Sequence, residues 1–294
     1  MHPLSDRKPG LAMLITDQLA ADIQRAVAGA LAEDIGTGDI TARLTQADSR
    51  ARGTVLSRED AILCGRPWFD ACFRALDPEA RIAWAASDGD VIVAGQTLCE
   101  ISARTRALLT AERTALNFLQ LLSGTATLTR RYADAVIGTH ARIVDTRKTL
   151  PGLRLAQKYA VSTGGGSNHR LGLYDGVLIK ENHIIAAGGV RAALERARAV
   201  APSDVFVQIE VENLDQLAEA LAAGAGMILL DNMDAPMLRE AVRLSAGRAK
   251  LEASGGVRLD QVRAIAETGV DRISIGALTK NVRAIDLSLR HMEE

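Results

Sequence analysis

The second half of the chain alternates short apolar runs with longer segments whose apolar residues recur at helical spacing. The apolar runs are rich in Val and Ile and predict buried strands over residues 141–145, 176–180, 205–211, 227–231, 251–254 and 272–276. The intervening segments predict helices over residues 153–162, 190–200, 214–223, 237–245 and 259–267. This alternation is typical of parallel βα units, but the strands are fewer than the roughly eight of a complete (β/α)8 barrel. We therefore expect an α/β fold with an open or incomplete barrel in this half.

The first half has a different pattern. Short strands are predicted over residues 54–57, 61–64, 81–85, 91–93 and 98–101, and helices over residues 18–33, 68–76 and 105–137. The last helix is expected either as one long helix or as two, broken at Gly124. This mixture predicts an α+β sandwich domain that precedes the barrel.

Four parts of the chain are expected from these patterns. Residues 1–16 are predicted to be a flexible lead-in, and residues 17–125 the N-terminal sandwich domain. Residues 126–280 are predicted to form the catalytic barrel domain. Residues 281–294 are expected to be a C-terminal helix that packs back on the N-terminal domain.

Composition excludes several classes of function. The formal net charge is only -1 and aromatic residues make up 3% of the chain, so neither a basic nucleic-acid surface nor base stacking is expected. The three cysteines are an odd number without a Cys-x-x-Cys pair, which argues against a disulfide framework or a zinc site and favours a reducing cytoplasm. No apolar run is long enough to cross a bilayer.

Polar residues follow almost every predicted strand of the barrel. Because ligands bind at the carboxyl ends of parallel strands, these residues indicate one shared site at the barrel mouth. They are Asp145, Arg147, Lys180, Glu210, Glu212, Asp231, the Ser254-Gly255-Gly256 turn and the Ser274-Ile275-Gly276 turn.

Cations are concentrated in the same region, around the glycine run at 164–166. They are Arg147, Lys148, Arg154, Lys158, His169, Arg170, Lys180 and His183. An adjacent Arg and Lys at a strand end can hold a carboxylate in two hydrogen bonds and place a point charge beside it. Taken alone, each charge could equally be solvated and the glycine run a flexible turn. Together they favour a pocket for a small ligand with several negative charges.

Lys180 and the two carboxylates near it leave specific alternatives open. Lys180 could bind an anion, form a Schiff base if an apolar pocket lowered its pKa, or reach solvent. Glu210 and Asp231 could hold sugar hydroxyls or Mg²⁺, or they could be helix caps or surface acids.

Two further features complete the candidate site. The turns at Ser254-Gly255-Gly256 and at Gly276 precede predicted helices, and paired glycine turns of this kind form a phosphate cup in many barrels. Arg113 and Asn117 lie one turn apart on a predicted helix, so they could address one ligand or partner, or form a solvated face. The hairpin at Asp88-Gly-Asp lacks the lysine of a lipoyl carrier and is expected to be structural.

With these motifs assembled, the chain resembles the quinolinate phosphoribosyltransferases, also called carboxylating nicotinate-nucleotide pyrophosphorylases. The resemblance runs from about residue 25 onward and rests on residues 112–118, 145–154, 164–170, 178–183, 210–212, 230–232, 254–256 and 276–279. It implies a sandwich domain with an open barrel, and a homodimer. It also implies conversion of quinolinate and 5-phosphoribosyl-1-pyrophosphate to nicotinate mononucleotide, pyrophosphate and CO2, with Mg²⁺, in de novo NAD synthesis.

The resemblance also implies roles for individual residues. Arg113 would reach the partner subunit's site, and Lys148 would lie beside the pyrophosphate. Glu210 and Asp231 would face the ribose and the metal as catalytic and metal-binding residues. The two quinolinate carboxylates would be held by Arg147, His169, Arg170 and Lys180, and the 5-phosphate by Ser254, Gly255 and Gly276.

Three other functions compete with the transferase. One is a lyase with Lys180 as the Schiff-base residue. Another is a regulatory protein that binds a phosphosugar without turning it over. The third is a pyrophosphorylase-like relative from molybdenum-transport operons. The complete Arg147-Lys148 and His169-Arg170 pairs favour quinolinate over these.

Overall fold

The computed structural model describes residues 17–292, which form two compact units. The described residues up to Arg130, together with Thr149–Gly165 and those from Thr279 on, belong to the first unit, and Arg131–Lys148 and Gly166–Leu278 to the second. The chain thus returns to the first unit twice, whereas the sequence suggested a boundary near residue 125 and one return, over residues 281–294. The predicted lead-in, residues 1–16, lies outside the described residues.

The first unit is built on an antiparallel sheet in the order β12-β1-β5-β3. Its strands are β1 (Arg50–Ser57), β3 (Arg81–Trp84), β5 (Thr97–Arg104) and β12 (Leu287–Met292), and β2 (Ala61–Ile62) pairs separately with β4 (Val91–Ile92). Burial alternates along the second half of β1, as expected of a sheet with one face on the core.

The C-terminal segment corrects a prediction. Residues 287–292 form strand β12 and not a helix, and they pair antiparallel with β1 from Arg52↔Met292 to Ser57↔Leu287. Leu287 and Leu289 recur with a period of two and pack on the core, which is the periodicity of a strand. The pairing also satisfies backbone groups of β1 that would otherwise lie at a sheet edge.

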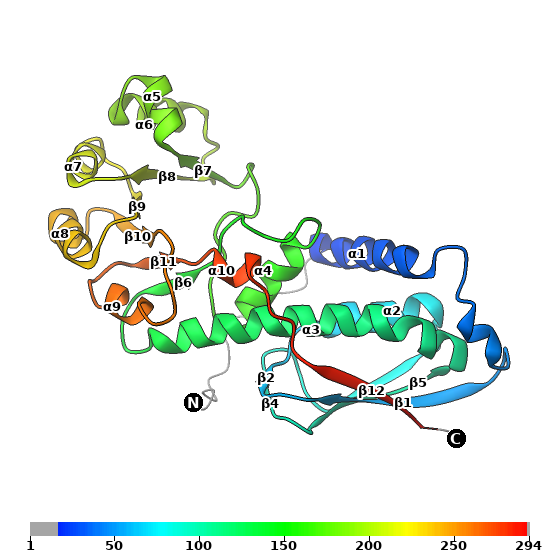
Figure 1. Ribbon diagram of the computed structural model, residues 1–294. Coiled ribbons are helices and arrows are strands. Elements are labelled where there is room, and N and C mark those ends of the chain that lie inside the picture. The colour runs from blue at the N-terminus through cyan, green and yellow to red at the C-terminus, as the bar shows by residue number, and fades with distance from the viewer. Residues whose placement is uncertain (1–16, 293–294) are drawn as a thin grey trace. The chain divides into compact units, whose positions relative to one another are not determined.

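The first unit also contains helices. They are α1 (Asp17–Ile35), α2 (Arg66–Leu76), α3 (Thr105–Ala135), α4 (Arg154–Thr163) and the short 3-10 helix η1 (Thr41–Leu44). Figure 1 shows α3 running beside the sheet formed by β1, β5 and β12. The core includes the fully buried aromatic residues Trp68, Phe69 and Phe73, and all three cysteines are buried and unpaired.

The hairpin at Asp88 is structural in this unit. The Asp88 carboxylate accepts hydrogen bonds from the backbone N–H groups of Gly65 and Arg66 and from the Tyr159 hydroxyl. Burial raises the pKa of Asp88, and these donors oppose that shift.

The second unit contains a six-stranded parallel sheet in the order β6-β11-β10-β9-β8-β7. Its strands are β6 (Arg142–Val144), β7 (Gly176–Ile179), β8 (Phe206–Val211), β9 (Met227–Asp231), β10 (Lys250–Ser254) and β11 (Arg272–Ser274). The first two strands of this unit in sequence, β6 and β7, lie at opposite ends of the sheet order, so the barrel is open between them. The predicted incomplete barrel is confirmed.

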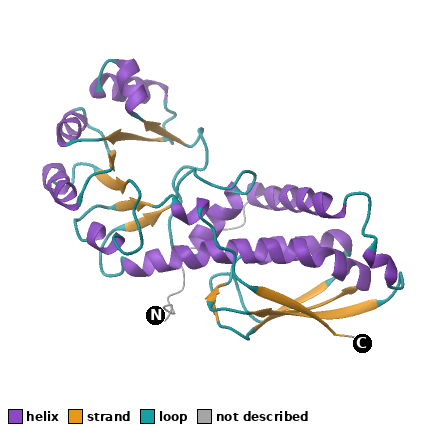
Figure 2. Cartoon of the chain, viewed as in Figure 1, coloured by secondary structure: helices purple, strands orange, loops and turns teal. Residues whose placement is uncertain are grey.

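Helices α6 (Val190–Val200), α7 (Leu214–Ala222) and α8 (Ala235–Ser245) alternate with these strands, followed by the shorter α9 (Val262–Ala266) and α10 (Ala277–Lys280). Figure 2 shows this alternation of strand and helix. The sequence did not predict α5 (Glu181–Ala187), because none of its residues is buried and it therefore has no apolar stripe. Among the described residues, no helix is both long and apolar enough to span a membrane.

Gly124 does not break α3, which is a single helix of 31 residues. A Cβ at Gly124 would lie 2.2 Å from the carbonyl oxygen of Arg283, in the segment that leads to β12. The glycine is therefore needed for close backbone approach, not for a helix break.

We expect Gly124→Ala to lower the free energy of unfolding by about 1–3 kcal/mol, because the added carbon overpacks a backbone contact. The matched control is Gly29→Ala in α1, where an added Cβ meets nothing within 4 Å. That change should raise the free energy of unfolding by about 0.5–1 kcal/mol through helix propensity. Urea unfolding measures both values, and equal effects of the two substitutions would contradict the close approach.

Candidate active site

The loop that carries the glycine run is fixed beside strand β6. Ser167 N–H donates to the Ile143 carbonyl (2.8 Å), and Asp145 N–H donates to the Ser167 carbonyl (3.1 Å). The fully buried Asp145 carboxylate then accepts from Asn168 Nδ2 and from the backbone N–H of His169, both at 2.7 Å. Asp145 therefore holds the His169-Arg170 pair at the end of β6.

Arg170 is fixed in this corner, and the charge of Arg147 acts on it. Arg170 Nη1 donates to the Gly176 carbonyl (2.9 Å). Burial lowers the pKa of Arg170, the Arg147 charge lowers it further, and Asp175 acts in the opposite direction. Two guanidinium groups that repel each other form a strong site for an anion, because an anion relieves the repulsion.

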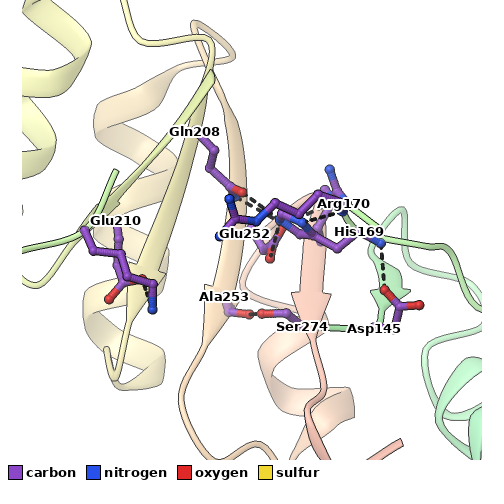
Figure 3. Close-up of polar contacts among 10 residues, drawn as sticks. Asp145, His169, Arg170, Gln208, Glu210, Glu252, Ala253 and Ser274 are labelled. Carbon is purple, nitrogen blue, oxygen red and sulfur yellow. Dashed lines mark hydrogen bonds and ion pairs between the residues drawn. The ribbon is translucent and has the colours of Figure 1, made fainter. Parts of the chain in front are cut away.

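His169 is directed toward the interior of the barrel (Figure 3). Its side chain is 8% exposed, and its Nε2 lies 2.8 Å from Gln208 Oε1. Its Nδ1 accepts the backbone N–H of Arg170 at 2.7 Å, and its ring packs edge-on against Phe206. Both ring nitrogens thus contact protein groups.

A second group of charges lies at the ends of β7, β8 and β9. Lys180 Nζ is 3.7 Å from Glu210 Oε2. Burial raises the pKa of Glu210, Lys180 lowers it, and the nearby Asp231 raises it again. The carboxylates of Glu210 and Asp231 are therefore close enough to repel each other, as expected for a site that binds a cationic group.

The environment of Lys180 does not support a Schiff-base role. Its side chain is 54% exposed and paired with a carboxylate. A nucleophilic amine must be neutral, and a neighbouring carboxylate stabilises the charged ammonium instead.

The glycine turns lie at the ends of β10 and β11. A Cβ at Gly276 would come within 3.2 Å of Lys148 Cδ, so the lysine side chain crosses directly over this glycine. Gly255 has φ +111°, and a Cβ there would lie 2.3 Å from Asn232 Oδ1. Helix α10 follows Gly276 at once, but α9 begins only at Val262, later than the predicted residue 259, so the turn at 254–256 does not lead directly into a helix.

The predicted group of eight cations is divided in the structure. Arg147, Lys148, His169, Arg170, Lys180 and His183 belong to the second unit, but Arg154 and Lys158 belong to the first. Lys158 is fully buried in α4, whose neighbouring residues Ala156, Tyr159 and Ala160 pack into the core of the first unit. The sequence grouped Arg154 and Lys158 with the site because they are close to it along the chain. In the structure they lie in α4, which packs in the first unit.

Three other predicted residues take separate positions. His183 Nδ1 accepts the Lys180 backbone N–H (3.0 Å) and so caps α5. Arg113 and Asn117 are both exposed on one face of α3 in the first unit, in keeping with their spacing.

Sequence reasoning missed three polar residues below the mouth: the buried Gln208 and Glu252, and the partly buried Arg272. Glu252 is fully buried on β10, between Arg272 Nε (3.2 Å) and Gln208 Nε2 (3.3 Å). A charge within the apolar run 251–254 was the available signal, because a buried charge needs partners on adjacent strands.

These features define an α/β-barrel enzyme that binds a small, multiply anionic substrate at the carboxyl ends of its strands. Comparison with known families gives the particular one. Residues 39–123 match the N-terminal domain, and residues 125–290 the C-terminal domain, of quinolinate phosphoribosyl transferase. The chain belongs to the quinolinate phosphoribosyltransferase family.

Individual relatives agree with this assignment. The chain is 40% identical over 257 residues to the probable carboxylating nicotinate-nucleotide pyrophosphorylase of Bacillus subtilis, covering 87% of this chain and 89% of that protein. It is 41% identical to the chloroplastic enzyme of Arabidopsis thaliana, covering 92% and 82%. The solved structure of the nicotinate-nucleotide pyrophosphorylase from Francisella tularensis aligns with TM-score 0.90 and 43% identity, covering 98% of this chain and 100% of that one.

Asp145→Asn is expected to destabilise the second unit by about 1–3 kcal/mol. The carboxylate accepts from Asn168 Nδ2 and from His169 N–H, and the NH2 group of the new amide would face one of these two donors. The control is Asp271→Asn at the amino ends of the strands, where Oδ2 accepts a single hydrogen bond from Leu251 N–H. Urea unfolding should show the larger loss for Asp145→Asn. A loss no greater than that of the control would argue against Asp145 as the anchor of His169 and Arg170.

Proposed function

We propose that this enzyme transfers the phosphoribosyl group of 5-phosphoribosyl-1-pyrophosphate to the ring nitrogen of quinolinate. The products are nicotinate mononucleotide, pyrophosphate and CO2, in the de novo route to NAD. The observation that carries the proposal is the set of charged side chains at the strand ends: the His169-Arg170 segment that Asp145 anchors beside β6, and the Lys180–Glu210 pair (3.7 Å) at β7 and β8. One side of the site suits a dianion and the other a cationic sugar. We also propose a cytoplasmic location, which fits the three unpaired thiols.

Quinolinate carries two carboxylates on adjacent ring carbons. In our proposal Arg147 and Arg170 hold them through paired hydrogen bonds, Lys180 adds a charge from β7, and His169 supports Arg170. The negative charges of the bound carboxylates would then offset the repulsion between the two guanidinium groups.

The phosphorylated donor would lie toward β10 and β11. Ser254, Gly255 and Gly276 would bind its 5-phosphate through backbone N–H groups and the serine hydroxyl. Lys148, whose side chain lies over Gly276, would contact the departing pyrophosphate.

Glu210 and Asp231 fit a role toward the ribose and Mg²⁺. Burial and mutual repulsion raise the pKa of Glu210, and a nearby positive charge offsets that repulsion. The described residues contain no group of three or more His, Cys, Asp or Glu placed to hold a metal, so Mg²⁺ would also need ligands from the donor's phosphates and water. When bound, Mg²⁺ supplies neutralisation of the leaving pyrophosphate.

No covalent intermediate with the protein is required. Holding the ring nitrogen in line with the anomeric carbon can contribute roughly 7–11 kcal/mol to lowering the barrier. Glu210 and Asp231 would stabilise positive charge that develops on the sugar as pyrophosphate leaves. The positively charged ring nitrogen then stabilises the electron pair left on the adjacent carbon when its carboxylate departs as CO2, and a proton from water takes the place of the carboxylate.

The direct test measures release of pyrophosphate and of CO2 from purified, Mg²⁺-supplied protein. We expect both products in equal amounts, only when quinolinate and the ribosyl donor are both present, and little turnover of nicotinate. Donor binding without turnover would favour a regulatory phosphosugar-binding protein. Trapping of a carbonyl substrate on Lys180 by borohydride would favour the lyase.

We further propose a homodimer in which Arg113 of one subunit completes the partner's site. The exposure of Arg113 together with Asn117 on α3 supports this arrangement. Arg113→Ala should therefore lower activity strongly while leaving the unfolding transition nearly unchanged.

A mixture of Arg113→Ala and Lys180→Ala proteins tests the sharing of sites. Each mixed dimer would contain one intact site, so random exchange should restore about a quarter of wild-type activity from two inactive parents. The control mixes each variant with itself. Absence of recovery after subunit exchange has been demonstrated by mass spectrometry would refute the shared site.

A further inference from the structure

A row of polar contacts runs through the barrel interior and ends at Arg170. Arg272 Nε lies 3.2 Å from Glu252 Oε2, and Gln208 Nε2 donates to the same oxygen at 3.3 Å. Gln208 Oε1 lies 2.8 Å from His169 Nε2, and His169 Nδ1 accepts the Arg170 backbone N–H at 2.7 Å. Gln208 on β8 and Glu252 on β10 meet because alternate strands supply one layer of a barrel interior.

The donor and acceptor directions along this row follow from its Arg272–Glu252 end. Arg272 Nε lies 3.2 Å from Glu252 Oε2, and a carboxylate in such an ion pair only accepts hydrogen bonds. Gln208 must therefore direct its NH2 group toward Glu252 and its oxygen toward His169. A flipped amide would place its oxygen against the carboxylate and its NH2 group against the imidazole.

The orientation of Gln208 in turn determines the tautomer of His169. An acceptor at 2.8 Å requires a proton on Nε2, and a backbone donor at 2.7 Å requires a lone pair on Nδ1. Only the neutral Nε2–H imidazole meets both conditions. Glu252 Oε1, 3.7 Å from His169 Nε2, also favours the proton on that nitrogen.

We propose that Gln208 and Glu252 are positioning residues that fix His169 as the Nε2–H tautomer and thereby fix the backbone of Arg170 at the substrate carboxylate. Both side chains are fully buried, so they act through His169 and do not touch the substrate. The predicted effect on quinolinate binding rests on the proposed function, whereas the tautomer itself does not.

The first test uses Gln208→Met, which keeps the side-chain length but has neither donor nor acceptor. The Michaelis constant for quinolinate should rise roughly tenfold, as expected for loss of one buried hydrogen bond. The constant for the ribosyl donor should stay unchanged, because the proposed phosphate-binding residues lie on other strands. The control, Ser245→Ala, removes a buried hydroxyl bonded at the amino end of β10 and should change neither constant.

The second test observes the imidazole directly by 15N NMR of the full-length protein. The chain has five histidines, and loss of one signal set in a His169→Asn protein assigns His169. We expect a protonated Nε2 and an unprotonated Nδ1 in the wild type, and a mixture of tautomers in Gln208→Met. Glu252→Gln should give a similar mixture, because without the carboxylate the Gln208 amide can flip.

Three results would overturn the proposal: a wild-type His169 protonated on Nδ1, an unchanged tautomer in both variants, or a parallel rise in both Michaelis constants. If Glu252→Gln does not fold, Gln208→Met decides alone. A wild-type protein that shows the expected tautomer but does not turn over quinolinate would support the positioning of His169 and refute the proposed function instead.

Discussion

Proximity of like charges is the constraint on which the site depends. Arg147 and Arg170 repel each other, and burial of Arg170 adds to the unfavourable free energy. The folded unit holds Arg170 in place through Asp145, which anchors the segment before it, and through the Gly176 carbonyl, which accepts from its guanidinium. In the proposed function, a substrate with two carboxylates offsets the repulsion between the two arginines when it binds.

On the opposite side of the mouth, the like charges that lie near each other are negative. Burial and the nearby Asp231 raise the pKa of Glu210, and Lys180 offsets part of that shift. Positive charge that develops at an anomeric carbon would find these carboxylates already oriented. The strand ends carry both kinds of charge at one edge of the sheet, Arg147 after β6 and the acids after β8 and β9. Lys180 after β7 lies between them in function, since it pairs with Glu210 at 3.7 Å.

The buried row of Arg272, Glu252, Gln208 and His169 shows how the barrel interior reaches this edge. Each member has a partner whose donor or acceptor character is fixed by the member before it. Polar networks of this kind specify one arrangement because any flipped group leaves a buried donor or acceptor unsatisfied. Rigidity at Arg170 thus originates two strands away from the substrate.

Much of this molecule was determined by local sequence. The strands and helices of the second unit follow the periodicity of apolar residues, and strand ends carry polar residues because parallel strands share one carboxyl edge. The sequence alone predicted the open barrel and most of the candidate residues. It failed at the C-terminus, where the two-residue period of Leu287 and Leu289 places a strand beside β1. It left open whether the long helix breaks at Gly124, because the role of this glycine depends on a carbonyl more than a hundred residues later in the chain. Only the tertiary structure assigned Arg154 and Lys158 to the first unit, paired Glu252 with Arg272 and fixed the His169 tautomer. These outcomes depend on which side chains meet across strands and units, and no local pattern encodes such contacts.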